Sequence, residues 1–145
     1  MTLIEVTDNS GSIIELDWLV KAEVVHRQLR PMLPTDYVAR MRVIFANGAR
    51  LLVAEHEGQV VGLAVWRLVE NTYEGLRLYI DDLVTDENKR STGIGKLLLQ
   101  HLEIKAKNFG CHVLTLDSGV QRAAAHKFYF REGMHIPSFC FRKSL

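Results

Sequence analysis

Cysteine is scarce in this sequence, and its scarcity excludes a disulfide-stabilised fold. The two cysteines, Cys111 and Cys140, have a spacing that matches no metal-ligand pattern. We expect both to be buried free thiols, because unpaired cysteine is usually packed inside a protein. None of the six histidines pairs with another at the helical spacing that brings two imidazoles to one ion. The sequence therefore predicts no metal site.

Long apolar runs and a net charge are also lacking. No stretch reaches the roughly 18 apolar residues that a membrane-spanning helix needs. Residues 1–10 are acidic and mixed, whereas a secretory signal has a basic stretch followed by an apolar one. The formal charge is +1 and no basic stripe is present, which argues against a nucleic-acid partner. We therefore expect a cytoplasmic protein that binds neither membrane nor nucleic acid.

What the sequence does contain is typical of one globular domain. Hydrophobic residues make up 48% and charged residues 24% of the 145 residues, a length that suits one ordinary domain. No internal repeat, low-complexity tract or linker interrupts the chain. We expect a single domain over residues 1–145.

The N-terminal part of the chain predicts a short strand and two helices. Residues 2–6 are typical of a strand, and the Ser-Gly-Ser turn at 10–12 predicts the start of a helix that ends before Pro31. A second helix is expected from Pro34 to the Asn-Gly stop signal that ends at Gly48. The buried face of the first helix is expected to contain Ile13, Leu16, Leu19, Val20 and Val24.

The rest of the chain changes from an antiparallel meander to alternating strands and helices. Three strands are expected over 50–57, 60–69 and 75–85, then a helix, a strand, a helix and a strand over 93–109, 112–118, 121–132 and 138–144. The helix over 93–109 is expected to place on one side Ile94, Leu97, Leu98, Leu102 and Ile104. The predicted fold is α/β, a mainly antiparallel twisted sheet flanked by helices in the order β-α-α-β-β-β-α-β-α-β.

The turn before the helix at 93–109 is suited to an anion. A segment that leaves a strand and opens a helix offers free backbone N–H groups and the positive end of the helix dipole. Gly93 and Gly95 remove side chains that would keep a ligand from the backbone, and Lys89, Arg90 and Lys96 add positive charge. The natural ligand of such a turn is a phosphate or a pyrophosphate.

Two well-known nucleotide-binding glycine loops do not match this turn. A nucleotide-triphosphate loop needs glycine where Arg90 stands and Ser or Thr where Leu97 stands, so it is excluded. A dinucleotide-binding fingerprint needs glycine where Leu98 stands. A solvated turn whose glycines only fix the backbone stays open on these residues alone.

The run Arg-Ser-Thr-Gly-Ile-Gly at 90–95 resembles the Arg/Gln-x-x-Gly-x-Gly/Ala pyrophosphate loop of the GNAT superfamily of acyl-CoA-dependent N-acetyltransferases. The resemblance extends from about Tyr79 to Gly133, with "DDLVT" before the loop and "HKFYFREG" after it. The predicted order of elements is similar to the whole family fold. The resemblance implies an enzyme that transfers an acetyl group from acetyl-CoA to a primary amine of a small molecule, by direct attack in a ternary complex.

The resemblance also implies which residues bind acetyl-CoA. A bulged strand, splayed from its parallel neighbour, would expose the backbone of Leu83 and Val84 to the pantetheine arm and the thioester. Many members have Asn where this chain has Arg122, so the hydrogen bond of that Asn is lost and Arg122 becomes a candidate phosphate ligand. The loop that would bind the pyrophosphate comprises Lys89, Arg90, Ser91, Thr92, Gly93, Ile94, Gly95 and Lys96.

The reaction needs an acid and a base. Tyr129 stands where the family places the acid that protonates the departing thiolate, although an aromatic of a core-facing helix side is the alternative. An attacking amine must lose a proton, and Asp81 and Asp82 enter the expected site on one strand. Alternation predicts that they point to opposite faces of the sheet. We prefer Asp81 as the base and expect Asp82 to be a structural partner of nearby backbone; deprotonation by water alone is the alternative.

The acceptor amine is not specified by the sequence. The family builds its acceptor pocket from segments that correspond here to about 25–37, 69–74 and 135–141. Glu70 and Glu74 would suit a cationic amine, whereas the C-terminal tail is similar to that of aminoalkylphosphonate N-acetyltransferases. A non-catalytic acyl-CoA sensor or scaffold of the same fold is the alternative function. The apolar last strand is a candidate homodimer interface.

Overall fold

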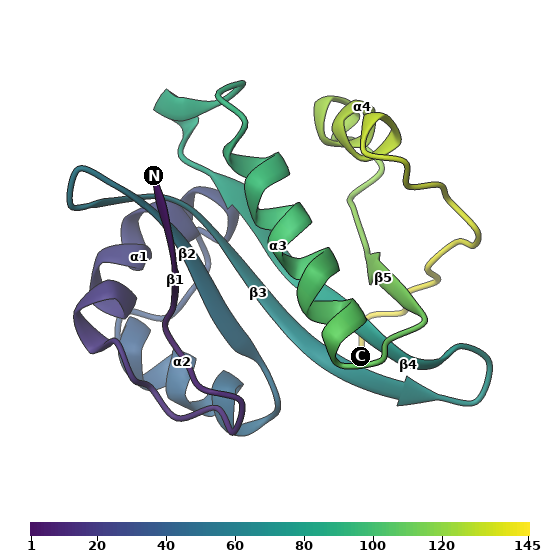
Figure 1. Cartoon of the computed structure of the whole chain (residues 1–145), viewed down its shortest axis with the longest axis horizontal. Helices are drawn as coiled ribbons and strands as arrows, with labels where there is room; N and C mark the ends of the chain where they lie inside the picture. The colour runs from purple at the N-terminus through teal and green to yellow at the C-terminus, as the bar shows by residue number, and fades with distance from the viewer. The chain divides into compact units, whose positions relative to one another are not determined.

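The computed structural model describes all residues from 1 to 145 and contains two compact units, Met1–Thr115 and Leu116–Leu145. No helix has the length and apolar character needed to cross a membrane. The predicted mixed α/β fold is confirmed (Figure 1). Its elements are β1 (Thr2–Glu5), α1 (Leu16–Leu29), α2 (Tyr37–Ala46), β2 (Arg50–His56), β3 (Gln59–Asn71), β4 (Gly75–Thr85), the short 3-10 turn η1 (Glu87–Lys89), α3 (Ile94–Asn108), β5 (Val113–Leu116) and α4 (Ala123–Arg131).

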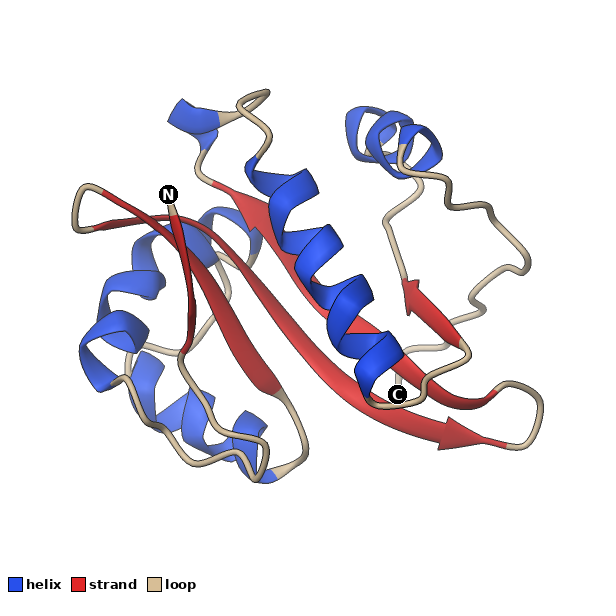
Figure 2. Ribbon diagram, viewed as in Figure 1, coloured by secondary structure: helices blue, strands red, loops and turns tan.

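The strands form one sheet in the order β1-β2-β3-β4-β5. The first four strands pair antiparallel, and Figure 2 shows the long β3–β4 hairpin crossing the middle of the sheet. The predicted meander is therefore confirmed. The hairpin turn falls at residues 72–74, slightly later than predicted, because the Asn71 side chain accepts hydrogen bonds from the backbone N–H groups of Tyr73 and Glu74.

Helices α1 and α2 bury the core against one face of the sheet. In α2 the Asp36 side chain caps the first turn by accepting from Ala39 N at 3.0 Å, and Tyr37, Met41 and Phe45 are buried. They pack with α1 and with strand residues of the same face, which are Leu51, Val53, Val60, Leu63, Val65 and Val84. The predicted second helix is confirmed.

The predicted face of α1 is mostly wrong. The helix begins at Leu16 after Glu15, beyond the serine turn, and it buries Leu19, Ala22, Val25 and His26. Leu16, Val20 and Val24 are exposed. Apolar residues occur on both sides of this helix, so periodicity alone did not decide which row contacts the sheet.

Helix α3 covers the opposite face of the sheet. It buries Ile94, Leu98, Leu99, Leu102 and Ala106. A Cβ atom at Gly62 of β3 would lie 2.5 Å from Ile94 Cγ2 and 3.3 Å from Leu98 Cδ1, so this glycine permits close helix–sheet packing. The prediction that Ile104 belongs to the buried side is wrong, because two residues beyond Leu102 the helix has turned about 200°.

The expected last strand is absent from the structure. Residues 138–144 alternate in character but have no strand conformation and make no backbone ladder. Alternation predicts an extended backbone, whereas a strand also requires a neighbour that supplies hydrogen bonds. The expected burial of both cysteines is likewise wrong. Both are free, as predicted, but Cys111 is half-buried and Cys140 is exposed.

Candidate active site

The turn between β4 and α3 has the backbone shape of an anion-binding loop. Ser91 and Gly93 both have left-handed φ angles, of 62° and 85°. The Thr92 hydroxyl donates to the Lys89 carbonyl and fixes the turn between them. Alternating left-handed residues turn successive N–H groups toward one side, which is the arrangement of an anion-binding nest.

The backbone N–H groups of residues 91–96 have no acceptor within the chain. The first hydrogen bond at the start of α3 is the one from Leu97 N to Gly93 O, at 3.0 Å. A Cβ atom at Gly93 would meet nothing within 4 Å, so the backbone here is open to a ligand. Lys89, Arg90 and Lys96 are exposed around these groups. The loop therefore offers free donors and positive charge, which fits a pyrophosphate.

Helix α1 holds the start of this loop in place. The Gln28 side-chain oxygen accepts from Glu87 N at 2.9 Å, and its amide nitrogen donates to Asp86 Oδ1 at 3.3 Å. Asp86 also accepts from Asn88 N at 3.1 Å. Gln28 could not be predicted from the sequence, because its partners lie 58 and 59 residues further along the chain.

A β-bulge in β4 interrupts the regular alternation of side-chain directions at the two aspartates. Val65 of β3 pairs with Asp82 and Trp66 pairs with Ile80, so Asp81 is an extra residue without a partner in the register. The predicted bulge is therefore present, two residues before Leu83. Because a bulge resets the alternation, both carboxylates lie on the α1–α2 side of the sheet, and the prediction that they point to opposite faces is wrong.

The Asp81 carboxylate is paired with the guanidinium of Arg67. Arg67 Nε donates at 2.9 Å and Nη2 at 2.5 Å to Asp81 Oδ2, and Arg67 Nη1 donates to the Asn47 carbonyl after α2 at 3.1 Å. The Asp81 side chain is 23% exposed, so it keeps contact with solvent. This carboxylate is both positioned and accessible.

The Asp82 carboxylate lies at the centre of a buried hydrogen-bonded chain. His26 Nε2 lies 2.7 Å from Asp82 Oδ2, and Arg30 Nε donates to Oδ1 at 2.7 Å. His26 Nδ1 lies 2.9 Å from the hydroxyl of Tyr37, which is buried. Burial by itself would raise the pKa of Asp82, but the hydrogen bonds and charges of His26 and Arg30 hold it below its usual value. These contacts are structural, but they are made to side chains of α1 and the residue that follows it, whereas nearby backbone was the predicted partner.

The acetyl-CoA residues predicted on β4 follow the bulge directly. Leu83 pairs with Ala64 and Val84 with Leu63, and the Val84 side chain is buried in the core. The backbone immediately before β5 lies beside β4, because the backbone N–H of His112 donates to the Leu76 carbonyl at 2.9 Å. The splaying of β4 from β5 further along stays a prediction.

Tyr129 and Arg122 belong to the C-terminal unit. Tyr129 is in α4, with its ring centroid 5.4 Å from that of Phe128, and Arg122 immediately precedes this helix. Burial raises the pKa of the Tyr129 phenol, and the positive charge of Arg122 opposes this shift in part. A phenol with a raised pKa stays protonated at neutral pH, as an acid catalyst must.

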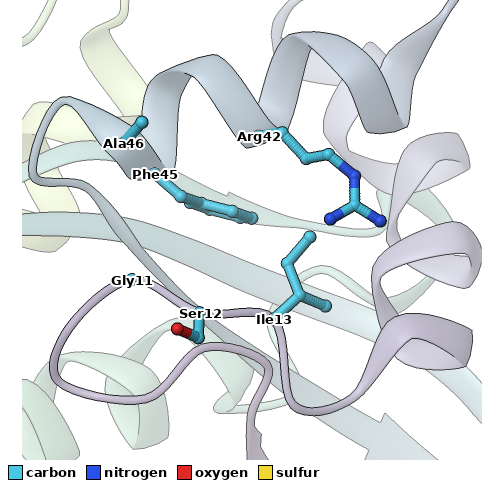
Figure 3. A pocket seen from close by; sticks show the side chains of 6 residues that line it. All are labelled: Gly11, Ser12, Ile13, Arg42, Phe45 and Ala46. Atoms are coloured by element: carbon cyan, nitrogen blue, oxygen red, sulfur yellow. The ribbon is translucent and has the colours of Figure 1, made fainter.

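A separate pocket of about 380 Å³ lies between α2 and the turn before α1. Figure 3 shows Arg42 and Phe45 extending from α2 toward Ile13. None of the predicted site residues lines this pocket, whose walls are Gly11, Ser12, Ile13, Arg42, Phe45 and Ala46. Nowhere in the structure do three His, Cys, Asp or Glu residues cluster as a metal site would require.

The Asp82 contacts predict an acid-dependent loss of stability. Replacing Asp82→Asn should lower the free energy of unfolding at pH 7 by about 3 kcal/mol, because it leaves the His26 and Arg30 groups without their anion. The folded pKa of Asp82 is below its ordinary value of 3.8, so this stabilisation is complete above that pH. It is lost as the pH falls through the folded pKa. Urea unfolding of both proteins from pH 7 to pH 2 measures the difference, which a structurally unimportant Asp82 would not show.

The comparisons with known proteins show the family of the chain. The model of the Acetyltransferase (GNAT) family matches residues 14–134, so the chain belongs to that family. It is 34% identical over 109 residues to an uncharacterized N-acetyltransferase, YhdJ of Bacillus subtilis strain 168, covering 74% of this chain and 77% of that protein. It is 31% identical over 94 residues to the aminoalkylphosphonate N-acetyltransferase of Salmonella typhimurium strain LT2, covering 64% and 61% of the two chains.

A solved structure shows the same fold at low identity. The aminoglycoside N-acetyltransferase AAC(6')-Iy in complex with CoA has a TM-score of 0.80 and 17% identity, with 99% of this chain and 95% of that chain covered. The predicted family and the prediction of an N-acetyltransferase are confirmed. Family membership therefore defines the class of reaction, acetyl transfer to amines.

Proposed function

We propose that this protein transfers the acetyl group of acetyl-CoA to a primary amine of a small molecule, by direct attack of the amine within a ternary complex. The free backbone N–H groups of residues 91–96 are the observation that supports it most, because they fit the pyrophosphate of the acetyl donor. Lys89, Arg90 and Lys96 would neutralise the remaining phosphate charge, and Arg122 is a further candidate for this role. The backbone of Leu83 and Val84 would bind the pantetheine arm and the thioester carbonyl.

The reaction requires two proton transfers, one from the attacking nitrogen to a base and one from an acid to the departing sulfur. The amine nitrogen attacks the thioester carbon, and the electron pair moves to the carbonyl oxygen, where backbone donors stabilise it. When the C–S bond breaks, the sulfur takes a proton from the Tyr129 hydroxyl, and the nitrogen gives up its own proton to a base. The products are an N-acetylated amine and CoA with a free thiol.

Asp81 is the better of the two candidate bases. The pKa of Asp82 is lowered and its lone pairs are engaged by His26 and Arg30, which makes it a poor proton acceptor. Asp81 is partly exposed and can accept the proton through a water molecule. The fixed Arg67 guanidinium would hold it in one orientation.

The acceptor class follows from weaker features. Glu74 is paired with Arg77 at 3.3 Å, so it is less available to a cationic amine than its position in the turn predicts. A relative named for aminoalkylphosphonates supports an amine that carries an anionic group. The cytoplasmic location and the homodimer stay predictions.

A screen of primary amines with acetyl-CoA tests the function. Purified protein should release free thiol at a rate well above the no-amine background for at least one aminoalkylphosphonate, amino acid, polyamine or aminoglycoside, with the acetylated product confirmed by mass spectrometry. Binding of acetyl-CoA without consumption of any amine would instead favour the non-catalytic sensor.

A further inference from the structure

The bulge in β4 is contacted from outside the sheet by the side chain of Arg30. Arg30 follows α1, 51 residues before the bulge, and its Nη2 donates to the Asp81 carbonyl at 3.2 Å. Its Nε and Nη2 also contact Asp82 Oδ1, at 2.7 and 2.6 Å. The bulge residue has no partner in the strand register, and Arg30 adds a side-chain hydrogen bond to its carbonyl.

His26 makes the second contact to the bulged segment, and the ring nitrogen that donates in this contact can be assigned. A carboxylate only accepts, so His26 Nε2 must donate to Asp82. The other ring nitrogen, Nδ1, lies 2.9 Å from the Tyr37 hydroxyl. His26 is 1% exposed and Tyr37 2% exposed, so both rings are closed to solvent, and the Asp82 side chain is 12% exposed at the outer end of the chain. Neither ring is accessible to a substrate, which leaves these groups a positioning role.

We propose that Arg30 and His26 are positioning residues that clamp the β4 bulge, and that the clamp fixes the backbone of Leu83 and Val84 where the thioester binds. The inference depends on the proposed function for its kinetic part, since only an acyl donor would use that backbone. Its structural part is independent, because it concerns the bulge alone. Helix α1 also holds the pyrophosphate loop through Gln28, so one helix would align both acetyl-CoA contacts.

The test variant is Arg30→Gln, because the Arg30 side chain is 52% exposed and its loss is compatible with folding. We expect kcat to fall about tenfold while the dissociation constant of CoA stays unchanged, because the displaced backbone acts on the thioester rather than on the pyrophosphate. Amide exchange measured by NMR should become about tenfold faster at residues 81–84 and unchanged in β2. Tyr37→Phe removes only the hydroxyl that contacts His26. This variant should change kcat and the exchange rate at residues 81–84 in the same directions as Arg30→Gln, but by less.

Arg40→Gln, at an exposed arginine of α2 outside the clamp, is the matched control and should leave all three measurements at wild-type values. A merely structural Arg30 would lower the melting temperature without changing kcat of the folded protein, and that result overturns the proposal. Exchange at residues 81–84 that stays at the wild-type rate also overturns it. If the wild-type protein acetylates no amine, the proposed function fails, and the exchange measurement still decides whether the clamp exists.

Discussion

Replacing Gly93→Val should weaken acetyl-CoA binding on the order of 10²-fold. Gly93 has a φ of 85°, and a left-handed conformation costs an ordinary residue about 1–2 kcal/mol. A β-branched side chain there would push the backbone out of this conformation and turn the N–H groups of the following residues away from the phosphates. Each hydrogen bond lost to a charged ligand costs roughly 1.5–3 kcal/mol. Isothermal titration calorimetry with CoA measures the change.

Gly110→Val is the matched control for this variant. Gly110 follows the other end of α3, has a φ of 78°, and like Gly93 would place a Cβ atom in open space. Both variants therefore introduce similar backbone strain, and their melting temperatures should fall by similar amounts. Only Gly93→Val should lose CoA affinity. Equal affinities of the two variants would mean that the loop does not bind the pyrophosphate.

The loop could be predicted from the sequence because its chemistry is local. Gly93, Gly95 and the surrounding cations are adjacent in the chain, and the start of the helix follows from the apolar spacing that begins at Ile94. The strands of the meander were predictable for the same reason. Turn residues and the alternation of apolar side chains determine them locally, as the agreement of β4 with the predicted strand at 75–85 shows.

The environment of the two aspartates could not be predicted, because it depends on contacts between distant segments. The family resemblance implied a bulge in this strand but not its position, and one extra residue at Asp81 defeats the alternation rule from there onward. His26 and Arg30 are ordinary members of a helical segment in the sequence, and their partners lie more than fifty residues away. The choice between the two faces of α1 has the same cause, since apolar residues occur on both.

Replacing Tyr129→Phe should lower kcat by about 10²-fold while the affinity for acetyl-CoA stays at its wild-type value. The change removes one hydroxyl and keeps the ring and its packing against Phe128. Without a proton donor the sulfur must leave as a thiolate, which raises the barrier to C–S cleavage. Stopped-flow or steady-state thiol release gives kcat, and calorimetry gives the affinity.

The pH dependence separates an acid from a packing residue. Burial raises the pKa of Tyr129 above its ordinary value of 10.0. The alkaline decline of the wild-type kcat should therefore begin at a higher pH than it would for an unperturbed phenol. A Tyr129→Phe enzyme with undiminished turnover would exclude the phenol as the proton donor, because no other change accompanies the loss of its hydroxyl.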